Sequence, residues 1–112
     1  MNINPLLIKL KEVTGLSVSP DVYRGSEEEY ITFNYADERD ILFADDKPIV
    51  EKADMQVHLF VLETTNYMDY KKKIKNYLLK IGACGISCSC IYENDTKKKH
   101  VIFEFEISEG RS

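Results

Sequence analysis

The chain has 112 residues, a length typical of a single domain, and its 44% hydrophobic residues suffice for a core without metal or disulfide crosslinks. Its formal net charge of −4 argues against a protein that mainly holds a nucleic-acid backbone, because such domains usually carry net positive charge. No signal peptide or membrane-length apolar run is visible, and three crowded cysteines do not suit a secreted disulfide framework. We therefore expect one soluble, intracellular domain over residues 1–112.

Charge is unevenly distributed along the chain. Glu27 to Asp54 contains ten acidic and three basic residues, a net charge of −7. Lys71 to Lys80 contains five lysines and no acid, and a second basic cluster follows at 97–99. The sequence therefore predicts two surfaces of opposite sign.

The first predicted element is a short amphipathic helix. Asn4 is a suitable cap, and Pro5 fits the first helical position because its missing N–H would have no partner there. Apolar residues then recur at helical spacing up to Gly15, which is a typical helix end. The stretch from Leu16 to Val22 is predicted to be a connector, with a short additional strand near Val22.

Two strands are predicted next, at Tyr30–Tyr35 and Ala53–Glu63, because apolar and polar residues alternate in both. The second has one fully apolar row and an opposite row that is polar at one end only, which favours a central strand covered on both faces over part of its length. Residues 36–48 between them are predicted to form an irregular loop with a few extended residues near Ile41, and Pro48 is expected outside any central strand.

The second helix is predicted to begin after the caps at 64–66 and to end at Gly82. Six residues define its apolar face: Tyr67, Tyr70, Ile74, Tyr77, Leu78 and Ile81. Its lysines occupy much of the remaining surface, as is usual for an amphipathic helix.

The last two strands carry one row each that we expect to be buried. The first row is Cys84, Ile86, Cys88, Cys90 and Tyr92, and the second is Val101, Phe103, Phe105 and Ile107. Burying both rows together predicts that Cys88 pairs with Phe103 and Cys90 with Val101, since a one-residue slip would set cysteines against glutamates. The complete pattern predicts an α+β fold of order α-β-β-α-β-β, with an antiparallel or mixed sheet of about four strands and two helices on one face.

The cysteines do not indicate a metal site. Structural zinc usually has four nitrogen or sulfur ligands, whereas Cys84, Cys88 and Cys90 supply three and His100 is expected on the opposite face. Core packing is the preferred interpretation, because free cysteine is among the most buried residue types. No cofactor is predicted.

Other polar side chains are compatible either with a catalytic or metal-binding role or with an ordinary solvent-exposed surface. His58 and His100 occupy strand positions and are more typical of a strand surface than of a general base. Glu104 and Glu106 share a face and would be able to hold a divalent metal, but alternate glutamates also keep a sheet face soluble. A metal-dependent nuclease using these or the loop carboxylates is the least favoured alternative; the loop carboxylates are Asp37, Asp40, Asp45 and Asp46.

The chain resembles the small tail-completion proteins of long-tailed bacteriophages, also described as tail terminators or head–tail joining proteins. The resemblance is carried by the order of Phe33-Asn34-Tyr35, then 43–49 (Phe-Ala-Asp-Asp-Lys-Pro-Ile), Gln56–Phe60, Thr65-Asn66-Tyr67, and His100–Phe105. It covers most of the chain after Tyr30, and Phe43 stands where the family pattern has tyrosine.

The resemblance implies a structural protein without catalytic activity. Such proteins form rings, expected here to be hexamers, that cap the tail tube and offer a docking surface to the head. The implied partners are further copies of the chain, the tail-tube protein and head-connector proteins, without a membrane or specific nucleic acid. The implied locations are the host cytoplasm during assembly and then the head-proximal end of the virion tail.

Opposite charge on two segments is compatible with a ring, in which one patch meets a different patch on the next subunit. We therefore expect the acidic segment to dock near the basic helix, or near the turn at 97–99, of a neighbouring subunit or of a tail-tube subunit. An unrelated intracellular interaction domain is the main alternative. The predicted interface residues are Asp37, Glu38, Arg39, Asp40, Ile41, Leu42, Phe43, Asp45, Asp46 and Lys47, together with Lys71, Lys72 and Lys73.

Overall fold

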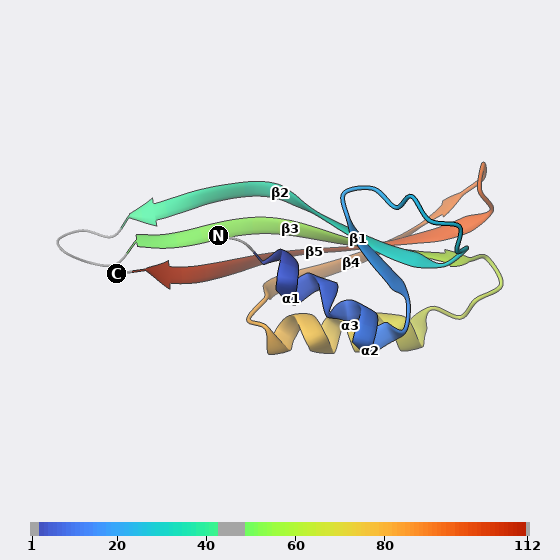
Figure 1. The fold of residues 1–112 in the computed structure, drawn as a ribbon, viewed down its shortest axis with the longest axis horizontal. Coiled ribbons are helices and arrows are strands. Elements are labelled where there is room, and N and C mark those ends of the chain that lie inside the picture. Colours follow the sequence, from blue (N-terminus) through green and yellow to red (C-terminus); the bar gives the residue numbers. More distant parts are fainter. Residues whose placement is uncertain (1–2, 43–48, 112) are drawn as a thin grey trace.

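A computed structural model describes residues 3–42 and 49–111 of the chain, and within these the side chains of residues 3–37 and 52–108 (Figure 1). The elements are α1 (Asn4–Ile8), α2 (Leu10–Thr14), β1 (Ser17–Pro20), β2 (Tyr30–Leu42), β3 (Ile49–Leu62), α3 (Met68–Lys80), β4 (Cys84–Glu93) and β5 (Lys98–Arg111). The molecule is elongated, with extents of 54 × 23 × 22 Å.

The strands form one mixed sheet of order β1-β2-β3-β5-β4, in which only the β1–β2 pair is parallel. The helices lie on one side of this sheet (Figure 1), so the α+β class and the one-sided helix layer are confirmed. The sheet has five strands, one more than expected. The fifth is β1 at 17–20, within the predicted connector, and the short strand expected near Val22 is absent. β1 forms because Val18 lies beside Ile31 and packs against the core.

The core lies between the sheet and the helices. β3 contributes its odd-numbered residues from Ala53 to Val61, and α3 contributes Ile74 and Leu78, both fully buried. β3 is central, as the sequence predicts, and none of the described helices lies on the opposite face of the sheet. We call that opposite face the open face. Among the described residues, the loop after β1 covers part of it, where Tyr23 stacks on Tyr30.

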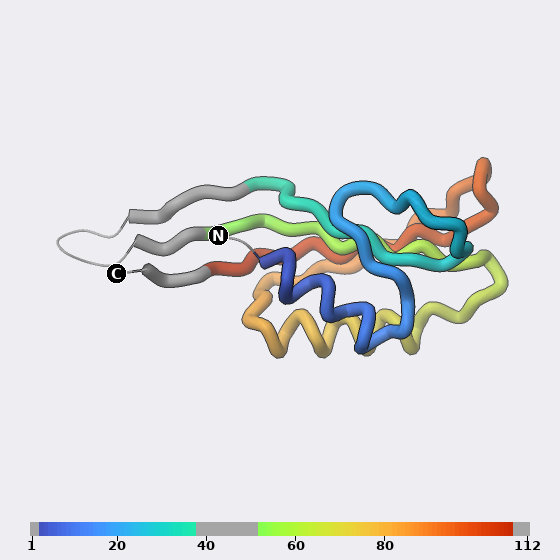
Figure 2. The backbone as a smooth tube through the Cα atoms, in the orientation of Figure 1, coloured from blue at the N-terminus to red at the C-terminus, as the bar shows by residue number. Residues whose placement is uncertain are grey.

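The N-terminal helix is divided at Lys9 into α1 and α2, and it runs antiparallel to α3 beside it (Figure 2). The predicted cap Asn4 is wrong, because Ile3 occupies the cap position and Asn4 is already helical. The backbone N–H of Ile3 instead donates to Tyr35 Oη at 3.0 Å, which ties this helix end to β2. Gly15 ends α2 in the left-handed conformation, with φ of 77°, as predicted.

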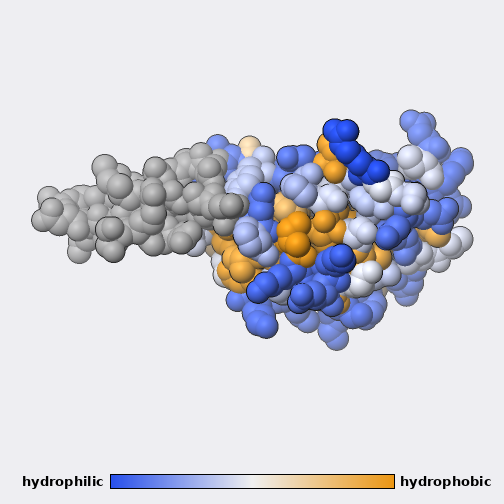
Figure 3. Space-filling model, in the orientation of Figure 1, coloured by the Kyte–Doolittle hydropathy of each residue, from blue (hydrophilic) through white to orange (hydrophobic). Residues whose placement is uncertain are grey.

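The second predicted helix is confirmed as α3. The caps predicted at 64–66 lie just before the cap position, which Tyr67 occupies; Asn66 Oδ1 accepts a hydrogen bond from the N–H of Met68 at 3.1 Å. The helix ends at Lys80, just before Gly82, and Tyr77 Oη donates to the carbonyl oxygen of Leu6 at 2.6 Å. This bond holds α3 against the N-terminal helices. Figure 3 shows an apolar area over those helices within an otherwise mostly hydrophilic described surface.

The predicted loop at 36–48 is wrong over its first half. β2 continues to Leu42 in antiparallel pairing with β3, and the last pair is Leu42 with Ile49. A register shift between Tyr35 and Asp37 leaves Ala36 as an extra residue, a β-bulge that lets the strand continue. We call the extension of β2, β3 and β5 beyond this bulge the arm.

The predicted β4–β5 register is confirmed, with Cys88 opposite Phe103 and Cys90 opposite Val101. The predicted buried cysteine row is wrong in two respects. An irregularity at 85–86 places Cys84 opposite Glu106, on the open face, and both Cys84 and Cys90 are exposed. β4 is an edge strand, so its side chains have strand neighbours on one side only.

Candidate interaction surfaces

The predicted acidic interface lies on the arm. Asp37 is exposed, and the segment from Glu38 to Leu42 belongs to β2 and pairs with β3. The register places Arg39 opposite Lys52. Four predicted interface residues lie outside the described residues, namely Phe43, Asp45, Asp46 and Lys47.

The predicted basic interface lies on α3. Lys72 and Lys73 are exposed and Lys71 is half-buried; Lys73 Nζ forms an ion pair with Asp69 at 3.2 Å, one helical turn away. α3 follows the end of β3 that is remote from the arm. The fourteen residues of β3 span roughly 45 Å at about 3.3 Å each. The acidic and basic segments of one subunit are therefore far apart, and contact between them requires two subunits.

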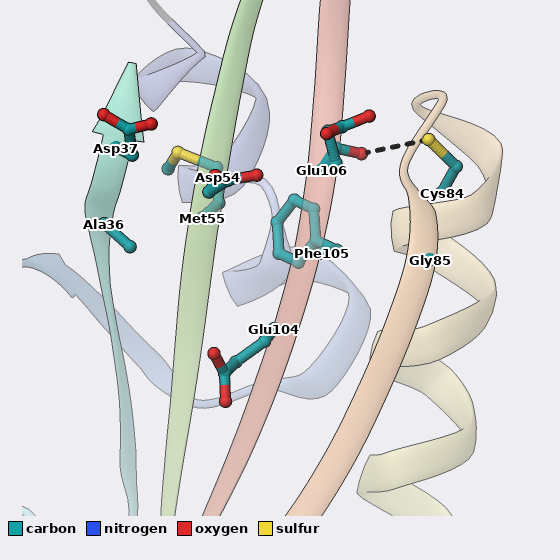
Figure 4. A pocket seen from close by; sticks show the side chains of 9 residues that line it. All are labelled: Ala36, Asp37, Asp54, Met55, Cys84, Gly85, Glu104, Phe105 and Glu106. Atoms are coloured by element: carbon teal, nitrogen blue, oxygen red, sulfur yellow. Dashed lines mark hydrogen bonds between the residues drawn. The ribbon is translucent and has the colours of Figure 1, made fainter.

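A depression of about 490 Å³ opens at the base of the arm. Its lining residues are Ala36, Asp37, Asp54, Met55, Cys84, Gly85, Glu104, Phe105 and Glu106, contributed by four strands (Figure 4). It lies where both bulges occur, since Asp37, Asp54, Glu106 and Cys84 are successive neighbours across the sheet. Cys84 Sγ donates to the carbonyl oxygen of Glu106 at 3.5 Å.

The carboxylates of this depression are partly neutralised. Lys52 Nζ lies 2.8 Å from Glu106 Oε1, and both side chains are half-buried. Glu104 and Glu106 share the open face as predicted, with Glu104 exposed. Within residues 3–42 and 49–111, no group of three or more histidine, cysteine, aspartate or glutamate side chains has the geometry of a metal site. The depression is best described as an acidic surface.

A hydrogen-bonded pair of histidines occupies the middle of the open face, and this pair was missed from the sequence. His58 Nδ1 lies 2.8 Å from His100 Nε2, and His58 Nε2 lies 2.8 Å from Asn34 Oδ1. Beyond them, Asn34 Nδ2 donates to Gln56 Oε1 at 3.2 Å, and His100 Nδ1 lies 3.5 Å from Glu93 Oε2. The even numbering of both histidines put them on one face, but their proximity depends on the β3–β5 register.

A row of stacked aromatic rings continues from His100 toward β1. Tyr23 stacks on Tyr30, Tyr30 on Phe60 and Phe60 on His100, with centroid distances of 4.1, 4.8 and 4.2 Å. Because neighbouring rings cover one another's faces, few ring faces remain for stacking with bases, and the row is better suited to stabilising the sheet than to binding single-stranded nucleic acid. The Lys98 ammonium lies 5.0 Å from the Tyr30 centroid.

The cysteines and the described helices do not indicate a further functional site. Cys88 is half-buried, and burial raises the pKa of its thiol, against the opposing effect of Lys71. A raised thiol pKa disfavours the nucleophilic thiolate. Among the described helices, none is long and apolar enough to span a membrane.

Comparison with known proteins gives a likeness of fold. No protein-family model matches the sequence, and no curated protein matches it. Among solved structures, the fold is similar to that of a chain in the virion of a native gene transfer agent particle, with a TM-score of 0.56. The match covers 92% of this chain and 84% of that chain at 10% sequence identity. At this identity, the likeness extends to the fold: an α+β domain with a mixed sheet and helices on one face.

Proposed function

We propose that this protein is a structural component of a phage-like virion and that it acts in assembly without catalysis. The observation that carries the proposal is the similarity of almost the whole fold to a chain of a gene transfer agent virion. The sequence resemblance to tail-completion proteins supports the same role. Fold alone does not determine function, so the surfaces must also be compatible with assembly.

The finer proposal is a ring, expected to be a hexamer, that caps the tail tube and offers the head its docking surface. Its partners are then copies of itself, the tail-tube protein and head-connector proteins, first in the host cytoplasm and later in the virion. Separation of the acidic arm from the lysines of α3 supports this arrangement, because complementary patches at different places on one subunit suit a head-to-tail ring.

The direct test is deletion of the gene in the phage or prophage that carries it, followed by electron microscopy of induced particles. A missing cap should leave heads and tails unjoined, and plasmid-borne protein should restore complete particles. Normal particles from the deletion strain would contradict the proposed role. An intracellular interaction domain unrelated to virions would give that result.

The ring itself is tested with purified protein. Solution mass and negative-stain microscopy should reveal a closed oligomer whose dissociation increases with salt, because the proposed contact joins opposite charges. Reversing Lys72 and Lys73 to glutamate should weaken the ring. The matched control reverses Lys9 and Lys11, two exposed lysines on the N-terminal helical segment, and changes the net charge by the same amount. Equal effects of the two double variants would exclude a specific role for α3.

A further inference from the structure

The two edges of the sheet differ in how well they are protected from pairing with another strand. β1 is only four residues long and ends in Pro20, and both features are typical of protected edges. β4 is ten residues long and contains neither lysine nor proline. It also exposes Ile91 by 51% and Tyr92 by 46%. Among the described strands, β4 therefore has the edge best suited to accept a further strand.

The helix layer places positive charge beside this edge. α3 runs alongside β4 at the boundary of the sheet (Figure 4). Tyr67 and Tyr70 of the α3 region and Cys88 of β4 pack against the same core. The ammonium groups of Lys71 and Lys75 oppose the rise that burial causes in the pKa of the Cys88 thiol. A strand added next to β4 would lie near these lysines, so acidic residues on that strand would be favoured.

The chain contains a strand of this kind. β1 pairs with β2 only from Tyr30 to Phe33, so the outer edge of β2 from Asn34 to Leu42 has no partner strand among the described residues. This nine-residue segment is close in length to β4, and it contains three acids, Asp37, Glu38 and Asp40, against one arginine.

We propose that β4 of one copy pairs edge to edge with the 34–42 segment of β2 in a second copy, so that the sheet continues across the subunit boundary. Backbone hydrogen bonds would provide the attraction, while Lys71 and Lys75 would select the acidic strand. The two edges are different surfaces, so the contact is head-to-tail and produces a ring or a filament. The inference rests on the proposed assembly role and names the surfaces that join its subunits.

The first test places proline on the β4 edge. In adjacent strand residues such as Ser89 and Cys90, one backbone N–H points toward β5 and the other away from the sheet. Ser89→Pro and Cys90→Pro are therefore made separately, and circular dichroism identifies the variant that stays folded. That variant should lose self-association, since its proline removes an outward N–H and blocks the added strand. A folded variant that assembles like the wild type would overturn the pairing.

The second test exchanges charge across the proposed boundary. Glu38→Lys with Asp40→Lys, or Lys71→Glu with Lys75→Glu, should each weaken self-association by about tenfold or more, and combining all four changes should restore much of it. Combining the arm changes with Lys9→Glu and Lys11→Glu is the matched control and should restore nothing. Restoration by both combinations would point to net charge and contradict the specific contact.

Hydrogen exchange provides a readout that does not depend on variants. On assembly, backbone amides at 34–42 and 85–92 should both gain protection, whereas the α3 amides should change little. A protein that stays monomeric at every soluble concentration would overturn the pairing. A ring that assembles without protection at these segments would also overturn it, while leaving the proposed assembly role intact.

Discussion

His58 Nδ1 lies 2.8 Å from His100 Nε2, and this contact joins β3 to β5 across the open face. A hydrogen bond at this distance needs one donor and one acceptor, so at least one of the facing nitrogens must lack its proton. Asn34 Oδ1 on the other side of His58 accepts a hydrogen bond from Nε2–H, which leaves Nδ1 as the acceptor and makes His100 the donor within the pair. This arrangement of donors and acceptors therefore requires an uncharged His58.

Acidification should weaken the fold through this pair. Burial lowers the pKa of His58 below its ordinary value of 6.5, and His100 lowers it further, against the effect of Glu104. Burial also lowers the pKa of His100, although Glu93 acts in the opposite direction. Because both folded pKa values lie below the unfolded ones, the stability they contribute is complete above about pH 6.5 and is lost as pH falls through the folded values.

The measurement is urea unfolding of the wild type and of His58→Gln/His100→Gln at pH 7.5 and pH 5.5. The wild type should lose more unfolding free energy over this interval than the double variant, because carboxylate titration is common to both proteins. At pH 7.5 the double variant should be less stable by roughly 1 kcal/mol or more, the usual value of a hydrogen bond. Parallel losses in the two proteins would show that the histidines do not control the pH response.

Gly25 should resist substitution by alanine. A Cβ at this position would overlap the hydroxyl end of the Tyr23 ring, which stacks on Tyr30 and accepts a hydrogen bond from the N–H of Glu27. Gly25→Ala should therefore cost about 1 kcal/mol, since a surface loop can give way more easily than a core. In a Tyr23→Ala background the same substitution should cost much less. An equal cost in both backgrounds would place the strain elsewhere.

Alanine substitution of two consecutive leucines in α3 should change the stability of the fold by very different amounts. Leu78 is fully buried between α3 and the sheet, whereas Leu79 is 53% exposed. Leu78→Ala should cost about 2–5 kcal/mol of unfolding free energy because it leaves a cavity, and Leu79→Ala should stay within about 0.5 kcal/mol. Helix propensity is matched between the variants. If both prove neutral, the orientation of α3 described above is wrong.

The three thiols should differ in reactivity toward iodoacetamide. Variants that retain one cysteine and carry serine at the other two positions allow each rate to be followed by mass spectrometry. Cys88 should react most slowly at neutral pH, because it is half-buried and burial raises its pKa, whereas Cys84 and Cys90 are exposed. In denaturant the three rates should converge. Fastest reaction at Cys88 would be incompatible with the packing of β4 on α3.

Local patterns in the sequence predicted most of the scaffold. Helical spacing located α3, and alternation in β4 and β5 was sufficient to pair Cys88 with Phe103. β1 was missed because a four-residue edge strand ending in Pro20 has too few residues to show alternation. The buried row through Cys84 failed for a related reason, since a bulge changes the alternation without a strong local signal.

The surfaces were less predictable than the scaffold. The segment after Ala36 looked like a loop because charged residues dominate it, yet pairing with β3 makes it a strand. Charge composition therefore led to the prediction of an interface in this segment but gave no information on its conformation. The His58–His100 contact depends on how β3 and β5 align. The two residues are 42 positions apart, so no local sequence pattern predicts this alignment.

The paired bulges also determine where this chain tolerates deletions. Removing Ala36 would leave Tyr35 opposite Met55 and Asp37 opposite Asp54, so every flanking residue of β2 would keep its present face. Removing one residue at 85–86 would have the same neutral effect on β4. Deleting Thr32 instead would shift the strand by one position and exchange its buried and exposed rows. Natural length variation in these strands should therefore concentrate at the base of the arm.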